Sequence, residues 1–230
     1  MRRPRRHGLG FFATLGLPLV LVLVMLSATG CETRPTLSFG ARGNAVVTLQ
    51  QRLIALHYDL AGADGAFGSQ TQHAVVAFQK VNGLARDGVV AASTWAKLDR
   101  PVVPRPRQSV IRTAFEVNLS SQVVYLTYLG TIVRIMDASS GNGQLYWSNG
   151  WQRATTPVGN YRVYSTYNGW QSGPLGSLYR PAYFVGGWAI HGSTSVPPTP
   201  ASHGCVRVTV ASMDRLWPFI WLGMPVSLYY

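Results

Sequence analysis

The spacing of apolar residues along the chain changes twice. Residues 11–26 form a run without a charged side chain, directly after an arginine-rich start. Between residues 46 and 98, apolar side chains recur at the spacing of amphipathic helices, and beyond residue 109 they alternate with polar ones, as in half-buried strands. The pattern predicts a short apolar segment, a small helical unit and a mainly β unit.

Three short helices, which would form a small bundle, are expected in the helical unit. The apolar sets that carry the pattern are Val46, Leu49, Leu53 and Leu56, then Ala74, Val75 and Phe78, and finally Trp95 and Leu98. A loop rich in Asp and Gly, residues 59–68, separates the first two helices. Asn82-Gly83 suits a left-handed cap that ends the second helix, and Ser93 is expected to cap the third.

The second unit has the pattern of strands joined by tight turns. Strands are expected at 115–119, 122–128, 132–136, 161–164, 183–190 and 226–230, with one helix after Thr209 that ends near Pro218. Residues 100–108 contain three prolines, which favours an extended, semi-rigid connection. We therefore predict an α+β multidomain chain, with a three-helix bundle over 36–99, a Pro/Arg linker over 100–108 and a mainly β domain over 109–230.

The N-terminal apolar run matches a secretory signal. Its 16 residues are short for a membrane span, which needs about 20, and four arginines precede it. Residues 1–30 are expected to be a signal peptide, with an uncleaved N-terminal anchor as the alternative. Ser27-Ala28-Thr29-Gly30 before Cys31 resembles the lipobox of bacterial lipoproteins, which implies acylation of Cys31. Ala28 stands where that motif usually has Leu, so ordinary cleavage nearby is a further alternative.

The chain is basic and has enough apolar residues for a core. Hydrophobic residues make up 47% and charged residues 12% of it, which excludes wholesale disorder. The net charge is +12, and loss of the four N-terminal arginines would leave +8. Such a charge favours anionic partners. Because the arginines are scattered and the export signal points away from nucleic acid, no nucleic-acid partner is expected.

The chain has two cysteines, Cys31 and Cys205. Exported proteins normally pair their thiols, so a disulfide between the two is one interpretation. If Cys31 is acylated, Cys205 is instead a free thiol in an oxidising compartment. Such a thiol is a liability unless its reactivity is used.

Short motifs spread over the helical unit carry a family resemblance. They include Leu49-Gln50-Gln51-Arg52-Leu53, Asp64-Gly65-Ala66-Phe67-Gly68, Phe78-Gln79, Asp87-Gly88-Val89-Val90 and Thr94-Trp95. Together they resemble the three-helix peptidoglycan-binding domain that is appended to cell-wall enzymes. The resemblance implies peptidoglycan as a partner and selects no particular side chains for glycan contact. A generic helical spacer is the alternative.

The β unit contains the densest group of reactive residues. Ser202-His203-Gly204-Cys205-Val206-Arg207 follows the segment His191-Gly192-Ser193. With Thr156-Pro157-Val158-Gly159 and Gly223-Met224-Pro225-Val226, these segments resemble the catalytic domain of the L,D-transpeptidases (YkuD-like), over most of residues 112–229.

Attack on a peptide carbonyl by Cys205 needs a base, because a thiol with a pKa of about 8.5 is only a few per cent ionised at neutral pH. Two histidines compete for this role: His203, two residues away, and His191, from a separate strand. The resemblance implies that His191 is the base, that the Gly192 carbonyl orients its ring, and that His203 shapes the nucleophile loop. Backbone N–H groups around His203, Gly204 and Cys205 are expected to form an oxyanion hole.

Other residues near the motif are candidates for binding and shaping. Arg207 could bind a carboxylate of a peptide stem, with a structural salt bridge as the alternative. Ser202 is a second candidate substrate-binding residue, although a hydrogen bond within the loop is the simpler role. The proline-rich residues 196–200 are expected to be stiff and to shape a lid. Most of the tryptophans Trp147, Trp151, Trp170 and Trp188 are expected in the core, and the alternative is a groove for sugar rings or the stem.

The resemblance implies an L,D-transpeptidase of cell wall biogenesis, located outside the cytoplasm as a membrane-anchored lipoprotein or in the periplasm or cell wall. Cys205 would attack the third residue of a tetrapeptide stem, release the terminal D-alanine and pass the acyl group to an amine, giving a 3-3 cross-link. Water as acceptor would make the protein an L,D-carboxypeptidase, and a non-catalytic wall-anchoring protein is a third reading. The partners would be peptidoglycan and, through the lipid anchor, the membrane. No metal or cofactor is expected, because Cys and His lack the clustered spacing of a zinc site.

Overall fold

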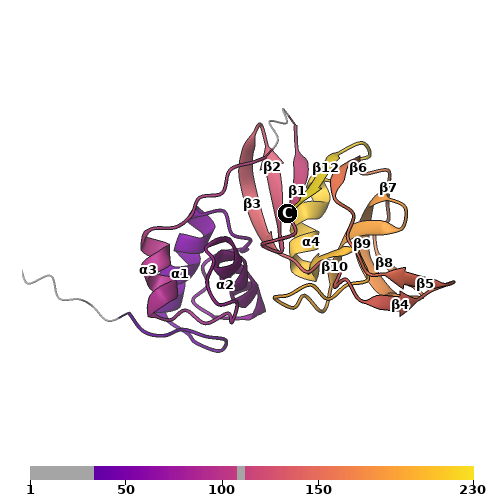
Figure 1. Ribbon diagram of the computed structural model, residues 1–230. Coiled ribbons are helices and arrows are strands. Elements are labelled where there is room, and N and C mark those ends of the chain that lie inside the picture. Colours follow the sequence, from indigo (N-terminus) through magenta and orange to yellow (C-terminus); the bar gives the residue numbers. More distant parts are fainter. Residues whose placement is uncertain (1–33, 108–111) are drawn as a thin grey trace, which may run out of the picture. The chain divides into compact units, whose positions relative to one another are not determined.

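The computed structural model describes residues 34–107 and 112–230, and Figure 1 follows the chain through them. The predicted signal peptide, 1–30, and Cys31 lie outside the described residues. A helical region precedes a mainly β region, as the sequence predicts for an α+β chain. Residues 34–230 form one compact unit.

The helical region contains α1 (Asn44–Ala55), α2 (Ser69–Val81) and α3 (Ala92–Asp99). The apolar side chains that the spacing predicts to be buried are buried, except Leu56, which follows α1 and is only partly buried. Asn82 caps α2 and Gly83 has a φ of +65°, which confirms the predicted left-handed end. The prediction that Ser93 caps α3 is wrong. The N–H of Trp95 bonds to the carbonyl of Ala91, so Ala91 is the N-cap and Ser93 lies inside the helix.

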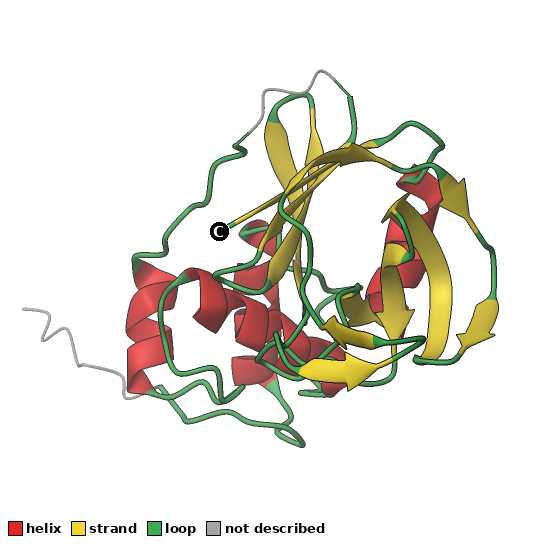
Figure 2. Cartoon of the chain, turned by 45° about the vertical axis from the view of Figure 1, so that its right-hand side comes forward, coloured by secondary structure: helices red, strands yellow, loops and turns green. Residues whose placement is uncertain are grey.

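Twelve strands make up the β region within the described residues. They are β1 (Ala114–Asn118), β2 (Val123–Tyr128), β3 (Thr131–Asp137), β4 (Leu145–Trp147), β5 (Trp151–Arg153), β6 (Gly159–Arg162), β7 (Ser165–Thr166), β8 (Trp170–Gly173), β9 (Gly176–Val185), β10 (Trp188–Ser193), β11 (Val206–Thr209) and β12 (Pro225–Tyr229). One sheet has the order β3-β2-β1-β12-β6, and a second has the order β11-β10-β9-β7, with β8 also on β9. β4 and β5 form a separate hairpin, and Figure 2 distinguishes the strands (yellow) from the helices (red).

One expected strand of the β region differs from the sequence prediction, and the expected helix is present. The single strand expected at 183–190 is two antiparallel strands, because the chain turns at Gly186, where φ is +48°, between β9 and β10. The expected helix is α4 (Val210–Leu216), capped by the Thr209 hydroxyl, which accepts the N–H of Ser212. Pro218 lies in a 3-10 turn, η1 (Trp217–Phe219), directly after it.

The core of the β region lies between its two sheets and α4. Its largest fully buried side chains include Phe115, Leu126 and Met136 from the first sheet, Ile190 from the second, and Met213 and Leu216 from α4. This core holds β10 and β11 in place; β10 carries the His-Gly motif, and β11 begins directly after Cys205.

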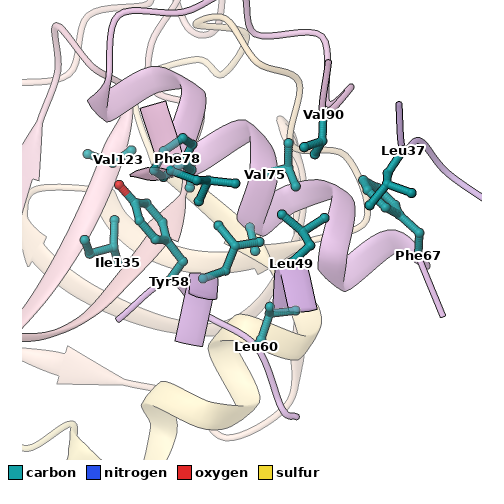
Figure 3. Close-up of a cluster of buried hydrophobic side chains, with 14 of the residues drawn as sticks. Leu37, Leu49, Tyr58, Leu60, Phe67, Val75, Phe78, Val90, Val123 and Ile135 are labelled. Atoms are coloured by element: carbon teal, nitrogen blue, oxygen red, sulfur yellow. The ribbon is translucent and has the colours of Figure 1, made fainter. Parts of the chain in front are cut away.

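A second core joins the helices to the outer face of β2 and β3. Leu49, Phe78 and Tyr58 share one buried cluster with Val123 and Ile135, as Figure 3 shows. The chain at 57–59 also pairs with β3. The Asp59 N–H donates to the Ile135 carbonyl at 2.9 Å, and the Ile135 N–H donates to the His57 carbonyl at 2.8 Å. Residues 100–108, predicted to be a linker, therefore do not separate two independent domains.

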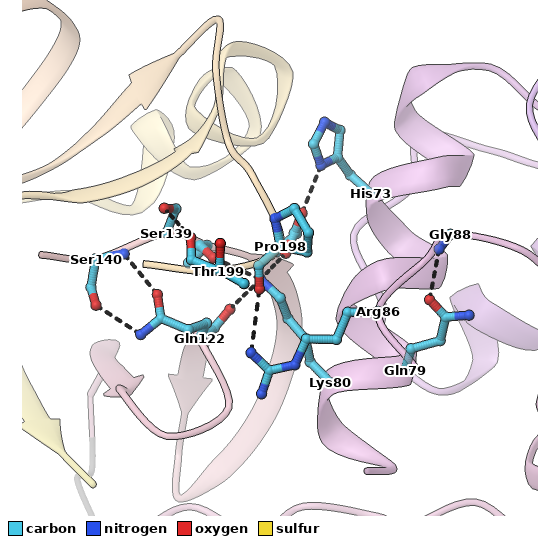
Figure 4. A network of polar contacts seen from close by, with 12 residues as sticks. His73, Gln79, Lys80, Arg86, Gly88, Gln122, Ser139, Ser140, Pro198 and Thr199 are labelled. Carbon is cyan, nitrogen blue, oxygen red and sulfur yellow. Dashed lines mark hydrogen bonds and ion pairs between the residues drawn. The ribbon is translucent and has the colours of Figure 1, made fainter. Parts of the chain in front are cut away.

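Charged side chains cross the same seam (Figure 4). Lys80 of α2 is buried, and its Nζ donates to Asp137 Oδ1 at 2.5 Å and to the backbone carbonyls of Gln122 and Ala138. His73 Nδ1 lies 2.7 Å from the other oxygen of Asp137. Arg86 donates to the carbonyl of Pro198 at 3.3 Å. These contacts tie α2 and the loop after it to the end of β3 and to the segment that precedes Cys205.

Candidate active site

The reactive residues come together where β10 and β11 run side by side. The two strands are parallel, with His191 opposite Arg207, and Cys205 directly precedes β11. Since side chains alternate along a strand, Cys205, Arg207 and His191 project from the same face of this sheet. All three line one cleft of about 580 Å³.

Cys205 carries a free, partly buried thiol. Its sulfur lies 3.8 Å from the Gly187 carbonyl oxygen, in the turn between β9 and β10. Burial raises the pKa of Cys205, against the opposing effects of the Ala189 backbone and of the Arg207 charge. The resting side chain is therefore a thiol at neutral pH.

His191 is buried, and its ring is fixed by the backbone. Nδ1 lies 2.9 Å from the Gly192 carbonyl oxygen, so this nitrogen carries the proton and donates it to that carbonyl. Burial lowers the pKa of His191 to about 4, opposed by the bond to Gly192 and assisted by the charge of Arg207. The ring is thus neutral at pH 7, and Nε2 keeps its lone pair. A neutral imidazole with a free lone pair can act as a base.

The loop that carries Cys205 is held by hydrogen bonds on both sides. The Ser202 hydroxyl donates to the Cys205 carbonyl at 2.5 Å and accepts the Gly204 N–H at 3.0 Å. The Thr156 hydroxyl donates to the Gly204 carbonyl at 2.7 Å. Gly204 has a φ of +135°, and a Cβ there would lie 2.2 Å from the indole nitrogen of Trp188, so only glycine fits. The loop is therefore fixed before substrate arrives.

The structure brings most of the predicted site residues into one cleft. His203 lines it and packs edge-on against Tyr146, with ring centroids 4.7 Å apart. Ser202, considered for substrate binding or for a hydrogen bond within the loop, makes hydrogen bonds within the loop. The structural salt bridge considered for Arg207 is not formed with any acidic side chain in the described parts of the chain.

Two hairpins that the sequence analysis did not predict line the open side of the cleft. Tyr146 and Gln152 come from the β4–β5 hairpin, and Trp170 and Leu178 come from β8 and β9. The signal for the first hairpin was Asn149-Gly150, a pair suited to tight turns, and both residues have positive φ. The prediction of core packing is wrong for Trp147 and Trp151, which are 67% and 71% exposed, and also for Trp170, which is exposed. Trp188 is partly buried against the core.

The proline-rich segment before Ser202 is anchored. Val196 is buried, the Ser139 hydroxyl donates to the Thr199 carbonyl at 2.8 Å, and Arg86 donates to the Pro198 carbonyl.

Across residues 34–107 and 112–230, no three His, Cys, Asp or Glu side chains converge as metal ligands. Within those same ranges no helix has both the length and the apolar character needed to cross a membrane.

Comparison with known proteins gives matches to both regions of the chain. The model of the L,D-transpeptidase catalytic domain matches residues 112–228, and the model of a peptidoglycan binding domain matches residues 42–98. The crystal structure of the L,D-transpeptidase from Xylanimonas cellulosilytica, residues 123–326, is 47% identical, with a TM-score of 0.81. The match covers 84% of this chain and 97% of that one. The chain belongs to the L,D-transpeptidase family, with a peptidoglycan-binding domain ahead of its catalytic domain.

Two further relatives match this chain over about 70 residues only. The N-acetylmuramoyl-L-alanine amidase CwlL of Bacillus licheniformis is 41% identical over 70 residues, and the zinc D-Ala-D-Ala carboxypeptidase of Streptomyces albus G is 43% identical over 74 residues. Each match covers 30% of this chain. The chain spans 19% of the amidase and 28% of the carboxypeptidase.

Proposed function

We propose that the protein is a peptidoglycan L,D-transpeptidase that forms an acyl-enzyme on Cys205 and transfers the acyl group to an amine, giving a 3-3 cross-link. The observation that supports the proposal is that Cys205 and a buried, neutral His191 line the same cleft, on one face of the β10–β11 pair. This arrangement supplies a nucleophile and a base at the same wall of an open cleft.

The first half-reaction begins from the neutral pair. Nε2 of His191 takes the thiol proton as the sulfur attacks the carbonyl carbon of the third stem residue. The bond between that residue and D-alanine then breaks, and the departing amine takes the proton from Nε2. The products are a thioester on Cys205 and free D-alanine. Gly192 keeps the ring oriented throughout, through its carbonyl.

The second half-reaction reverses these roles. An amine of a second stem attacks the thioester, His191 accepts its proton, and the thiol leaves with that proton. Backbone N–H groups of His203 and Cys205 are the candidates for the oxyanion hole, because the Gly204 N–H already donates to Ser202. Arg207 supplies a positive charge at the cleft for a substrate carboxylate.

The test is mass spectrometry of the purified protein incubated with tetrapeptide stems. The expected result is a protein mass increased by the acyl group, free D-alanine and a cross-linked dimer of stems. Cys205→Ala should abolish all three while unfolding at an unchanged temperature. Hydrolysed tripeptide without dimer would identify an L,D-carboxypeptidase, and stem binding without any product would identify a wall-anchoring protein.

We also propose that the protein acts outside the cytoplasm and that Cys31 bears a lipid. The apolar run and the small residues before Cys31 support this proposal. Cys31→Ala should release the protein from membranes without loss of activity on soluble stems. Retention in a high-salt wash distinguishes a lipid anchor from attraction of a basic protein to anionic lipid. Salt-soluble wild-type protein would contradict the lipid anchor.

A further inference from the structure

Two further hollows continue from the active-site cleft toward the helical region. Ser193 and Thr194 line the cleft and also line a second hollow of about 300 Å³. The other wall of this second hollow is α2, through Ser69, Gln70 and His73. The cleft at Cys205 therefore adjoins a space between the catalytic and the helical regions.

The second hollow in turn adjoins a third one. Ser69 and Gln70 also line a third hollow, of about 490 Å³, on the helical region itself. Its remaining wall is the Asp/Gly-rich loop, including the chain at 60–62 and Asp64. We call the second and third hollows together the α2 track. It leads from the edge of the catalytic cleft onto the peptidoglycan-binding domain.

The walls of the α2 track are fixed relative to one another. Asp59 of the helical region receives two hydrogen bonds from Arg215 of α4, at 2.6 and 2.8 Å, and one from Arg134 of β3 at 2.7 Å. Arg215 also donates to Gln70 in the track, at 3.0 Å. With the buried Lys80–Asp137 pair, these contacts hold the two walls in place, so a ligand meets a formed site.

The second hollow of the α2 track is lined by uncharged groups rich in hydrogen-bonding atoms, and in the third hollow Asp64 is the one charged lining residue. The second hollow is lined by hydroxyl, amide and imidazole groups together with the apolar Val196, Val210 and Ala211, and no Lys, Arg, Asp or Glu lines it. Stem peptides carry carboxylates and a free amine, which call for charged partners. Glycan strands carry hydroxyl and acetamido groups on apolar rings, which match this lining.

We propose that the α2 track binds the glycan strand next to the stem that Cys205 attacks. The proposal rests on the proposed function and adds a second binding region to it. The polymer would be held at the track while one of its stems enters the cleft. The track would thus favour stems attached to a glycan chain over free stems.

The test removes the two shared polar groups and adds bulk with the double variant Ser69→Leu/Gln70→Leu. Its matched control is Gln51→Leu/Ser93→Leu, which changes an exposed glutamine and an exposed serine on helices outside the track. Initial rates are measured with the free tetrapeptide, with the disaccharide tetrapeptide and with glycan chains several disaccharides long. Binding of glycan chains stripped of their stems is measured separately.

The track variant should lose at least tenfold in kcat/KM on the glycan chains, through KM, and keep its rate on the free tetrapeptide. It should also bind stem-free glycan at least tenfold more weakly, while the control matches the wild type in every assay. Equal losses on all substrates, or unchanged glycan binding, would overturn the proposal. So would competition for this binding by free stem peptide. If the wild type is inactive but binds stem-free glycan, and the Ser69→Leu/Gln70→Leu variant binds it at least tenfold more weakly, the proposed function is refuted and the glycan site is supported.

Discussion

At the scale of single residues, the proposed reaction depends on a thiol and an imidazole that are both neutral at rest. Burial raises the pKa of Cys205 and lowers that of His191. A preformed thiolate–imidazolium pair is therefore disfavoured, and in the proposed reaction the proton moves as the sulfur attacks. This differs from cysteine sites in which an adjacent positive charge keeps the thiolate ionised.

The two histidines of the cleft should differ in their effect on turnover. Removing a general base typically costs 10²- to 10⁴-fold, so His191→Ala should lower kcat on a soluble tetrapeptide by about that factor. His203→Ala removes the contact with Tyr146 and should cost about tenfold or less, mostly in KM. Release of D-alanine measures both. A larger kcat loss in His203→Ala than in His191→Ala would reverse the assignment of the base.

The buried His191 also makes folding stability depend on pH. Its pKa falls from 6.5 in the unfolded chain to about 4 in the folded one. Between these values the unfolded chain binds a proton that the folded one does not, so stability is complete above pH 6.5 and declines as the pH falls. From pH 8 to pH 5 the loss should be about 2 kcal/mol. Urea unfolding of the wild type and His191→Gln measures it, and an equal loss in both proteins would refute this cause.

At the scale of elements, the seam between α2 and β3 contains a buried ion pair. The Lys80 side chain is inaccessible to solvent, and that of Asp137 is nearly so. Each side chain has further polar contacts: Lys80 donates to the carbonyls of Gln122 and Ala138, and Asp137 lies within hydrogen-bond distance of the His73 ring. Removal of one charge leaves the other buried without compensation.

Lys80→Met should therefore lower the free energy of unfolding by about 3–5 kcal/mol. The double variant Lys80→Met/Asp137→Leu should recover part of this loss, because it removes the stranded carboxylate as well. Lys97→Met, near the end of α3, is the control and should change stability by less than about 0.5 kcal/mol. Chemical denaturation measures all three, and a loss with Lys80→Met no larger than with Lys97→Met would contradict a structural role for the pair.

At the scale of the whole molecule, the helical region is part of the fold of the catalytic region. The buried cluster that it shares with β2 and β3 includes Val123, Tyr125, Ile132 and Ile135. Segment 57–59 also covers the edge of β3 with backbone hydrogen bonds. A targeting module on a stiff linker would need neither feature.

Deletion of residues 34–99 should consequently reduce activity on soluble stems as well as on whole sacculi. The truncated protein would expose four apolar side chains, each worth about 1.5–3 kcal/mol when fully buried, together with a strand edge. Its unfolding temperature should fall, and it should tend to aggregate. Thermal unfolding and D-alanine release test this. An intact unfolding temperature with full activity on soluble stems would show that the helical region serves only to bind the polymer.

The sequence by itself determined the elements and the reactive group. Helical spacing located α1 and α2, alternation located β1 to β3, and the motifs at His191 and Cys205 identified the residues that meet in the cleft. These features are local, because an amphipathic period and a short motif depend on residues that are close together in the chain.

Only the tertiary structure decided how these parts act on one another. The turn at Gly186 split one expected strand into two, and exposure placed Trp147 and Trp151 outside the core. Burial lowered the pKa of His191, and side chains from distant segments joined the helices to β3. Burial and long-range pairing arise from contacts between residues far apart in the chain. A local pattern of apolar and polar positions does not specify which helix and strand faces pack against one another.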